Sequence, residues 1–406
     1  MTKVLAGIRV IEVAQWGFVP SAAAALSDWG AEVIKIEHPT RGDPIRGLNV
    51  AGLMAGTQGF TPMWEMLARG KRAIGLDIGT PGGLEVLMKL VESADVLVTS
   101  YLPPARRAMG FDLEQVRARN PRIIYARGSG QGPAGPDADK GGFDAISFWA
   151  RSGLAVNARE PATPFPPRLP GPAIGDFISG MYLAGGIAAA LLHRERTGES
   201  PVVDVSLLNA GMWAGQVAIT GSRLLDQDQI DWPAPHDQPG SVLANYYRTS
   251  DDRCITLNML QADRYWPGLC AVGDRPELAT DPRFADAAAR RQNREACVAA
   301  LDEMFAQFTL AEWAQRLSKQ DGQWDIVRTP REVHDDVQAE INGYLQFVEY
   351  PDGRTVSLVS APVQFDEQPN ELRAAGELGE QTDKVLEELG LSWDEIHELK
   401  VSSVIS

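Results

Sequence analysis

The sequence has few of the residues that build disulfide frameworks or metal centres. Among 406 residues there are three cysteines, Cys254, Cys270 and Cys297, too few and too scattered for either kind of site. The five histidines show no metal-ligand spacing such as His-x-x-x-His. We therefore expect no metal, and so little cysteine is most simply interpreted as a reducing, cytoplasmic setting.

Long apolar runs and positive charge are also scarce. No run of about eighteen uninterrupted apolar residues occurs, so we expect no transmembrane helix and no membrane partner. The formal net charge is −16, and so acidic a surface repels phosphate backbones, which argues against nucleic acid as a partner. The opening residues MTKVLAGIRVIEVAQWG place Arg9 and Glu12 inside an alternating apolar run, which is typical of a strand and unlike a signal peptide.

Several nucleotide and nucleophile motifs are missing. The turn after the first expected strand reads AQWGFVPSAAAA, where a dinucleotide site would need G-x-G-x-x-G. No G-x-x-x-x-G-K-[ST] and no G-x-S-x-G occurs in the chain. We therefore expect no nicotinamide cofactor, no Walker-type phosphate loop and no serine nucleophile elbow.

What is present is an alternation of strand and helix patterns, which predicts an α/β fold with a parallel sheet covered on both faces. Strands are expected at residues 8–13, 32–37, 73–76, 95–99, 122–126 and 202–207. Helices are expected at residues 20–29, 80–94 and 113–119. A long helix should run from Asp176 to about residue 196 and end at Gly198.

The pattern changes near residue 221. Residues 221–330 are predicted to form a smaller α+β domain that contains a hairpin and several helices. The C-terminal part predicts strands around an Asp-Gly turn and two closing helices. We therefore expect a large domain from residues 1–220, completed by residues 331–406, and a small domain from residues 221–330.

Basic residues gather in the loops expected around the strand ends. They are Lys35, Arg41, Arg46, Arg69, Lys71, Arg72, Arg106, Arg107 and Arg127. Ligands of open α/β sheets bind outside the carboxyl ends of the strands, so this cluster predicts an anion-binding crevice in an acidic protein. Any one of these residues alone is better explained as surface charge paired with a nearby acid, whereas the cluster as a whole favours the crevice.

The stretch GPAIGDFISGMYLAGG, residues 171–186, holds a single carboxylate, Asp176, among small and apolar residues. One interpretation is a helix N-cap, whose side chain accepts from free backbone N–H groups. The other is a carboxylate nucleophile. The two are compatible, because a helix N-terminus would keep Asp176 ionised at neutral pH, as a nucleophile must be.

Several stretches, in order, resemble the class III CoA-transferases, the family of formyl-CoA transferase and carnitine CoA-transferase. They include LAGIRVIEVAQWGFVPSAAAALSDWGAEVIKIEHPTRGDPIRG, KRAIGLDIGTPGG, PRIIYARGSGQG, GGFDAISFWARSG, AIGDFISGMYLAGGIAAAL and HRERTGESPVVDVSLLNA. The resemblance covers nearly the whole chain. It implies a Rossmann-like large domain that binds CoA, a small domain that shapes the substrate pocket, and an interlocked homodimer with acyl-CoA at its interface.

The catalytic aspartate of that family falls on Asp176. The resemblance implies an aspartyl anhydride, then an aspartyl-CoA thioester, and finally transfer of CoA to an acceptor carboxylic acid. Racemases of the same superfamily pair this aspartate with the histidine of a Gly-His-Asp segment. The matching residues here are Gly142-Phe143-Asp144, and Phe143 cannot move a proton. CoA transfer is therefore favoured, with an acyl-CoA racemase or isomerase and a non-catalytic acyl-CoA-binding protein as alternatives.

The resemblance also implies a set of CoA contacts. They are Gln15, Trp16, Gly17, Phe18, His38, Lys71, Arg72, Ser100, Tyr101, Arg107 and Lys140. The sequence departs from formyl-CoA transferase at several of these positions, and residues 235–245 lack its glycine-rich flap, which argues against oxalate or formate as substrates. Four aromatic residues, Trp16, Phe18, Phe143 and Trp149, favour a roomy apolar pocket for an aromatic or branched acid.

Overall fold

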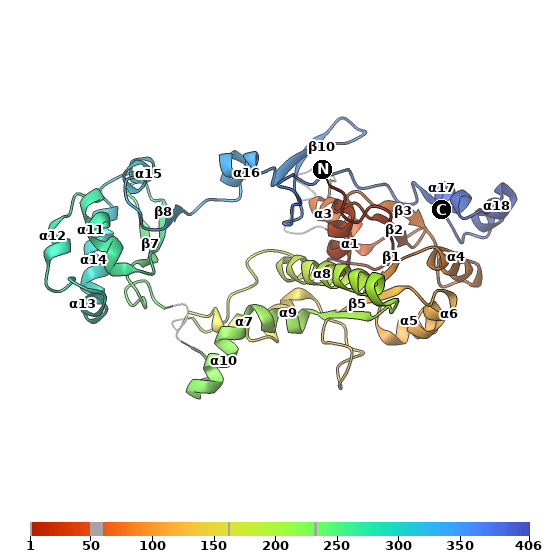
Figure 1. Ribbon diagram of the computed structural model, residues 1–406, viewed down its shortest axis with the longest axis horizontal. Coiled ribbons are helices and arrows are strands. Elements are labelled where there is room, and N and C mark those ends of the chain that lie inside the picture. Colours follow the sequence, from red (N-terminus) through yellow and green to blue (C-terminus); the bar gives the residue numbers. More distant parts are fainter. Residues whose placement is uncertain (1, 49–59, 161–162, 231–233) are drawn as a thin grey trace. The chain divides into compact units, whose positions relative to one another are not determined.

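The computed structural model describes residues 2–48, 60–160, 163–230 and 234–406. The chain divides into two compact units (Figure 1). The larger unit comprises Met1–Asn157, Pro167–Asp228 and Val337–Ser406, and the smaller comprises Ala158–Pro166 and Gln229–Asp336. We describe each unit by itself.

The larger unit is built on a six-stranded parallel sheet with the strand order β3-β2-β1-β4-β5-β6. Its strands are β1 (Arg9–Val13), β2 (Glu32–Glu37), β3 (Arg72–Gly75), β4 (Val96–Thr99), β5 (Ile124–Ser129) and β6 (Val202–Ser206). All six strands were predicted from the sequence to within three residues at each end. The chain winds outward from β1 in both directions, which leaves a topological switch point between β1 and β4, where such sheets bind ligands.

Helices cover both faces of this sheet, as the sequence predicts. On one face lie α1 (Phe18–Asp28) and α8 (Ile174–Thr197), and on the other α4 (Pro81–Glu92) and α6 (Leu113–Arg119). Successive strand residues point to opposite faces, so Val10 is buried under α1 and α8 while Ile11 is buried under α4. Both faces of the sheet are therefore apolar, as parallel sheets require.

The helix α8 is long and apolar enough to cross a membrane, judged by length and composition alone. In the larger unit its buried face packs against α1 and the sheet. A Cβ on Gly180 would overlap Oγ of Ser21 and lie 3.0 Å from the backbone nitrogen of Ala22. The small residues of α8 thus allow a close helix–helix approach, and α8 ends at Gly198 as predicted.

Short elements complete the larger unit. They are η1 (Pro44–Gly47), α3 (Pro62–Ala68), α5 (Pro103–Met109), η2 (Ala145–Ala150), α7 (Leu154–Asn157), α9 (Leu207–Ala214), α10 (Gln216–Leu225), α16 (Val337–Ile341), β10 (Leu345–Glu349), β11 (Thr355–Val359), α17 (Thr382–Glu388) and α18 (Trp393–Val401). The strands β10 and β11 form the predicted antiparallel hairpin. Beyond α18, Ile405 forms an isolated bridge to Leu76, which ties the C-terminal segment to the residue after β3.

The smaller unit has a three-stranded antiparallel sheet, β7-β8-β9, packed with helices. Its elements are β7 (Ala244–Arg248), β8 (Cys254–Asn258), α11 (Ala262–Val272), α12 (Glu277–Thr280), α13 (Ala287–Gln292), α14 (Arg294–Phe305), α15 (Leu310–Leu317), β9 (Trp324–Ile326) and η3 (Glu332–Asp335). Phe305 stacks between Tyr247 and Trp313 at centroid distances of 4.9 and 4.3 Å. Cys270 and Cys297 are buried in this core, as the sequence predicts.

Candidate active site

A cavity of about 280 Å³ lies in the larger unit, at the carboxyl ends of the strands that flank the switch point. Its lining comes from the turn after β1, the residue after β4, the end of β5, the loop before η2, and the first turn of α8. These residues include Gln15, Trp16, Gly17, Phe18, Ser100, Gly128, Ser129, Gly130, Gly141, Gly142, Phe143, Ile146 and Asp176. Asp176 is the one charged side chain among the described residues that line the cavity.

The carboxylate of Asp176 lies against the backbone of the turn after β1. A Cβ on Gly17 would overlap Oδ2 of Asp176 and lie 3.0 Å from its Cγ. The backbone carbonyl of Asp176 accepts a hydrogen bond from Oγ of Ser21 at 3.1 Å, which fixes the first turn of α8 on α1. The side chain of Asp176 is therefore placed by helix packing, and only glycine fits beneath it.

Asp176 is not the helix N-cap that the sequence predicts. The cap position is Ala173, in a left-handed conformation with φ +60°, and Asp176 lies three residues later. No hydrogen bond or ion pair within the described residues offsets its burial. Burial therefore raises the pKa of Asp176 to about 7, and the negative charge of Asp144 adds to the rise. Burial therefore opposes the effect expected of the helix end, which was to keep Asp176 fully ionised at neutral pH.

Asp144 is a second buried carboxyl in this site. Its Oδ1 accepts the backbone N–H of Ala145 at 2.7 Å, which caps η2. Its Oδ2 is buried, and the backbone N–H of Gly175 in the first turn of α8 opposes the effect of desolvation on this carboxyl. Burial also raises the pKa of Asp144. Two carboxyls in one desolvated site disfavour double ionisation, so Asp144 and Asp176 together bind protons more readily than isolated aspartates.

Apolar side chains form one wall of the cavity. The rings of Trp16 and Phe143 meet edge to face, with centroids 5.3 Å apart. Both rings remain partly exposed, at 37% and 48%, and Ile146 beside them is 54% exposed. Trp16 has φ +69°, a left-handed conformation that is costly for a bulky residue. Large apolar side chains are thus exposed to solvent in the same cavity as the Asp176 carboxylate.

A second cavity, of about 440 Å³, lies at the carboxyl ends of β1, β2 and β3. Its lining includes Gln15, His38, Arg41, Asp77, Tyr101 and Met109. Gln15 lines both cavities, and its backbone N–H donates to Oγ of Ser100 at 2.9 Å, which joins the turns after β1 and β4. The two cavities therefore adjoin across one turn.

The predicted CoA contacts divide into three groups. Gln15, Trp16, Gly17, Phe18 and Ser100 line the first cavity, and Gln15, His38 and Tyr101 line the second. Arg107 and Lys140 are exposed and line neither. Lys71 and Arg72 also lie outside both cavities. Trp149 was expected to line the apolar pocket, but it does not; its ring N–H donates to the carbonyl of Pro167 at 2.9 Å.

Most of the basic cluster is committed to ion pairs, so the single basic crevice does not form as expected. The pairs are Lys35 with Glu12 and Asp43, Arg46 with Glu37, Arg69 with Asp28, Lys71 with Glu12, Arg72 with Glu32 and Glu388, Arg106 with Asp112, and Arg127 with Asp204. Arg41 lines the second cavity. The sequence could not reveal the pairs whose acids come from distant segments, such as Asp28 for Arg69 and Glu388 for Arg72.

Comparison with known proteins matches nearly the whole chain to one protein family. The family model of CoA-transferase family III matches residues 5–382. A protein named (R)-2-hydroxy-4-methylpentanoate CoA-transferase, from Clostridioides difficile, is 31% identical over 402 residues, which cover 99% of each chain. A cinnamoyl-CoA:phenyllactate CoA-transferase from Clostridium sporogenes is 30% identical over 98% of this chain and 96% of its own.

The fold also matches a solved structure. The crystal structure of a CAIB/BAIF family protein from Brucella suis aligns with a TM-score of 0.81 and 26% identity, over 96% of this chain and 100% of that one. The match therefore extends over nearly the whole chain.

Proposed function

Because the chain belongs to CoA-transferase family III, we propose that it moves CoA from an acyl-CoA to a carboxylic acid, with Asp176 as the covalent nucleophile. The observation that carries this proposal is the position of the Asp176 carboxylate. It lines a cavity at the sheet switch point, next to glycines and exposed apolar rings, and among the described lining residues it is the one charged group.

The reaction then proceeds through two kinds of covalent intermediate. A carboxylate oxygen of Asp176 attacks the donor thioester carbonyl and the C–S bond breaks. This step releases CoA thiolate and forms an acyl-aspartyl anhydride. The thiolate attacks the Asp176 carbonyl, which expels the donor acid as a carboxylate and leaves aspartyl-CoA. The acceptor carboxylate attacks this thioester and expels CoA thiolate, which then attacks the acceptor carbonyl of the new anhydride and frees Asp176.

Each carbonyl attack develops negative charge on an oxygen, and the cavity offers backbone N–H groups for it. Phe18 begins α1, so the N-terminus of that helix borders the cavity. Glycines 128, 130, 141 and 142 also line it and carry no side chain that would keep a thioester carbonyl from the backbone. We assign oxyanion stabilisation to these two groups of donors, which is the largest catalytic contribution in comparable sites.

An acyl-CoA is long enough to occupy both cavities. With the thioester beside Asp176, the pantetheine arm crosses the turn at Gln15 and the nucleotide reaches the second cavity. His38 and Arg41 line that cavity and face the phosphates in this arrangement. Arg107 and Lys140 are exposed basic residues that remain predicted CoA contacts.

The substrate class follows from the apolar wall. Trp16, Phe143 and Ile146 are exposed within the cavity and favour an aromatic or branched acyl group, because such a group removes this surface from water. The two relatives described above carry names that refer to a branched hydroxy acid and to aromatic acids. We therefore propose an aromatic or branched carboxylic acid as donor or acceptor.

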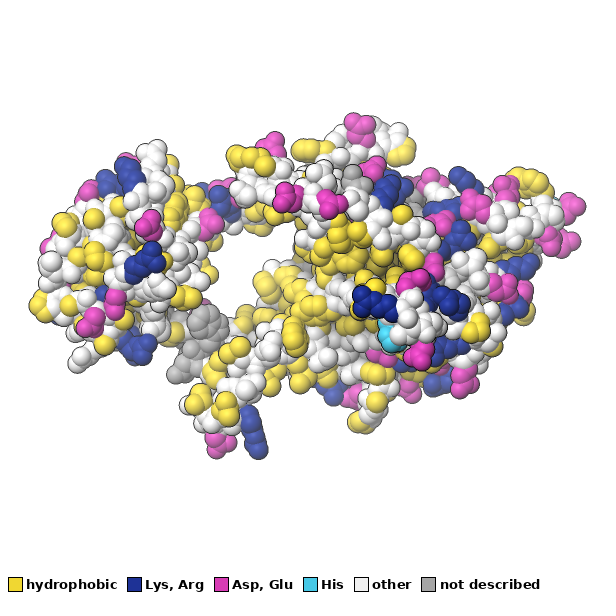
Figure 2. All heavy atoms as spheres, in the orientation of Figure 1, with side chains coloured by type: hydrophobic (Ala, Val, Ile, Leu, Met, Phe, Trp, Pro, Cys, Tyr) yellow, Lys and Arg dark blue, Asp and Glu magenta, His cyan; other side chains and the backbone are white. Residues whose placement is uncertain are grey.

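The assembly that we propose is a homodimer. No residue of α10 is buried within the described chain, and apolar side chains gather over this helix in Figure 2. Trp213, Val217, Leu224 and Leu225 are 62–80% exposed. Apolar patches of this kind mark interaction surfaces. Light scattering of the purified protein should give twice the mass of one chain, and a monomer would contradict the proposed dimer.

The mechanism is tested by trapping the covalent intermediate. The wild-type chain, incubated with a branched or aromatic acyl-CoA, should form an acyl-enzyme that hydroxylamine converts to a hydroxamate at Asp176. Asp176→Ala should form none and transfer no CoA. If Asp176→Ala transfers CoA at the wild-type rate, the proposal is wrong. Exchange of the substrate α-proton without an acceptor acid would instead support a racemase or isomerase.

A further inference from the structure

The turn after β1 is held by a buried ionic cluster that the proposed chemistry does not use. The backbone N–H of Trp16 donates to Oδ1 of Asp43 at 3.2 Å. The other oxygen of Asp43 pairs with Nζ of Lys35 at 2.9 Å, and both side chains are only 1% exposed. Oδ1 of Asp43 also accepts the N–H of Ile45, which caps η1. A single buried carboxylate therefore joins the Trp16 turn to the helix that follows β2.

The cluster extends well beyond Asp43. Nζ of Lys35 also contacts Oε1 of Glu12 at 2.8 Å and the carbonyl of Ala14 at 3.1 Å. The second oxygen of Glu12 accepts from Nζ of Lys71 at 2.6 Å, while Lys71 reaches the carbonyl of Pro20 at 2.8 Å. The Lys35 ammonium and its partners thus tie together both ends of the turn between β1 and α1.

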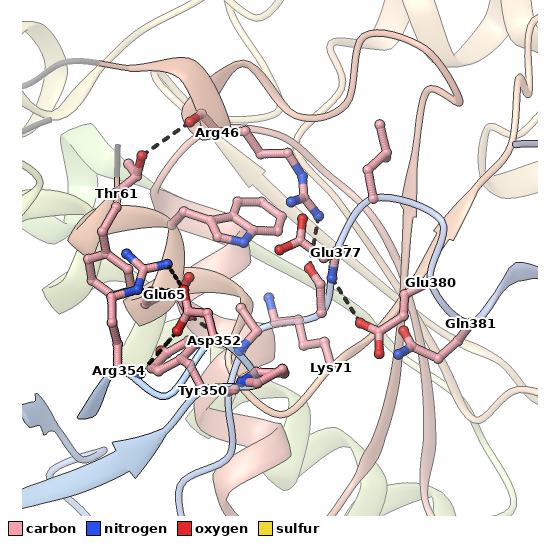
Figure 3. A pocket seen from close by; sticks show the side chains of 17 residues that line it. Arg46, Thr61, Glu65, Lys71, Tyr350, Asp352, Arg354, Glu377, Glu380 and Gln381 are labelled. Carbon is pink, nitrogen blue, oxygen red and sulfur yellow. Dashed lines mark hydrogen bonds and ion pairs between the residues drawn. The ribbon is translucent and has the colours of Figure 1, made fainter. Parts of the chain in front are cut away.

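The outer end of the cluster borders a third cavity of about 650 Å³, which is drawn in Figure 3. Lys71 and Arg46 line it, and the guanidinium of Arg46 stacks on the ring of Trp64 at 3.7 Å. Arg46 binds both oxygens of Glu37 at 2.7 and 2.8 Å, and Glu37 accepts the backbone N–H of Asp43 at 2.9 Å. Asp43 is therefore held from both its backbone and its side chain.

A gain in folding stability is not a sufficient reason for burying the charges of this cluster. Burial alone would lower the pKa of Lys35, but the carboxylates of Glu12, Asp43 and Glu37 together raise it, so Lys35 stays charged. Burial lowers the pKa of Lys71, which shares Glu12, to about 8. Buried ion pairs often contribute no more than apolar side chains of the same size, so their presence points to a need for one defined geometry.

The turn itself has such a need. A left-handed conformation is costly for tryptophan, and such residues persist only where the surroundings hold them. This conformation brings the Trp16 ring against Phe143 and places Gly17 beneath the Asp176 carboxylate. If the turn relaxed, the apolar wall and the contact surface of Asp176 would both change.

We propose that Asp43, held by Lys35, is a positioning residue that fixes the left-handed Trp16 turn and so sets the shape of the acyl pocket beside Asp176. This inference rests on the proposed function, because it assigns the pocket to an acyl group. Asp43 does not touch the reacting atoms; it acts through the backbone of Trp16. Its loss should change which acyl groups are accepted, in addition to lowering the rate.

The test compares Asp43→Ala with a matched control in steady-state CoA transfer from a phenylpropanoyl donor and from acetyl-CoA. Asp95→Ala is the control, because Asp95 likewise accepts a backbone N–H, from Arg9 at 2.9 Å, and pairs with the buried Arg194 at 2.8 Å. Asp43→Ala should lower kcat/KM for the aromatic donor about tenfold more than for acetyl-CoA. Asp43→Asn, which keeps an acceptor for the Trp16 N–H, should recover part of this preference, and Asp95→Ala should leave the preference unchanged.

A double-mutant cycle with Trp16→Gly separates positioning from a general loss of structure. Glycine adopts positive φ freely and has no ring, so nothing remains for Asp43 to position. In the Trp16→Gly background, Asp43→Ala should change the preference less than about twofold. An equal effect of Asp43→Ala in both backgrounds overturns the inference. Should Asp43→Ala not fold, Asp43→Asn takes its place in the same cycle.

The two proposals fail in distinguishable ways. A wild-type chain without CoA transfer, or an active Asp176→Ala variant, overturns the proposed function and this inference with it. An active wild-type chain whose donor preference is unchanged by Asp43→Ala overturns the inference alone.

Discussion

The carboxylate of Asp176 lies directly on Gly17, so that no side chain larger than hydrogen fits at position 17 without moving the carboxylate. The two residues come from different elements, the turn before α1 and the first turn of α8. The packing of α8 on α1, through Ser21 and Gly180, therefore sets the position of the carboxylate relative to the backbone that borders the cavity.

Gly17→Ala should displace the Asp176 carboxylate and lower kcat for CoA transfer about a hundredfold, the loss expected from a misplacement of about 1 Å. The acyl-CoA dissociation constant, measured by calorimetry, should change much less. The control is Gly185→Ala on the exposed side of α8, where a Cβ meets nothing within 4 Å. That variant should keep full activity and gain up to about 1 kcal/mol of stability from helix propensity. Equal activity of the two variants would contradict the proposed contact.

The rate of transfer should depend on pH through Asp176. Only the carboxylate anion attacks a thioester, and burial raises the pKa of Asp176 to about 7. Below that pH, kcat/KM should fall about tenfold for each pH unit, and above it the rate should level off. Stopped assays between pH 5 and 9 test this, and a flat profile across that range would exclude Asp176 as a nucleophile with a raised pKa.

Asp144→Asn should shift the acid limb of that profile. Removing the negative charge of Asp144 favours the anion of Asp176, so the midpoint should move to lower pH. The midpoint should stay above the ordinary aspartate range, because burial remains the larger cause. A shift to higher pH, or none, would show that Asp144 does not act on Asp176 through its charge.

The helix that carries Asp176 could be predicted from the surrounding sequence, and its role as candidate nucleophile came from the family resemblance, but its charge state could not be predicted. The apolar and glycine-rich pattern around it, and the stop at Gly198, are local features that the structure bears out as one long helix. Its pKa is raised by burial in the packing of α8 on α1, and further by the negative charge of Asp144, and both neighbours are distant in sequence. The prediction that Asp176 caps the helix was wrong because the cap position is taken by Ala173, which makes no side-chain hydrogen bond and so leaves no mark in the sequence.

The ion pairs of the basic residues also depend on contacts that the sequence does not show. The positions of these residues near strand ends suggested one crevice, although each residue alone was better explained by an ion pair with a nearby acid. The structure shows that Lys35 is enclosed by carboxylates of Glu12 and Asp43. The parallel sheet was predictable because apolar periodicity is local, whereas pairing of buried charges depends on strand order and register, such as Glu12 beside Lys35 on neighbouring strands.

The aromatic wall should control which acyl groups are accepted. Phe143→Ala removes a ring from the cavity wall on which an aromatic acyl group would pack, a contact of about 0.5–1.5 kcal/mol, and should lower kcat/KM for a phenylpropanoyl donor by up to about tenfold, with little effect on acetyl-CoA. Phe347→Ala removes a more exposed ring, 78% against 48% for Phe143, from β10 outside the cavity, and should change neither. A parallel loss with both donors would show that Phe143 supports the fold and not the acyl group.

Asp176 should also destabilise the folded chain at neutral pH. Its pKa in the folded chain, about 7, lies above the ordinary aspartate value of 3.8, so the unfolded chain releases this proton more readily. Stability from this group is therefore greatest below about pH 4, falls as the pH rises to about 7, and is constant above that. The difference between these two pKa values, about three at about 1.4 kcal/mol each, limits the loss in free energy of unfolding to about 4 kcal/mol.

Asp176→Asn removes this penalty, since the amide does not ionise. Urea unfolding should show the variant to be more stable than the wild type at pH 8, by up to about 4 kcal/mol, and nearly equal to it at pH 4. Asp228→Asn changes an exposed aspartate and should show no such pH dependence. A variant that is no more stable than the wild type at pH 8 would mean that the folded chain solvates the Asp176 anion, and the acid limb of the rate profile should then lie near pH 4 instead of 7.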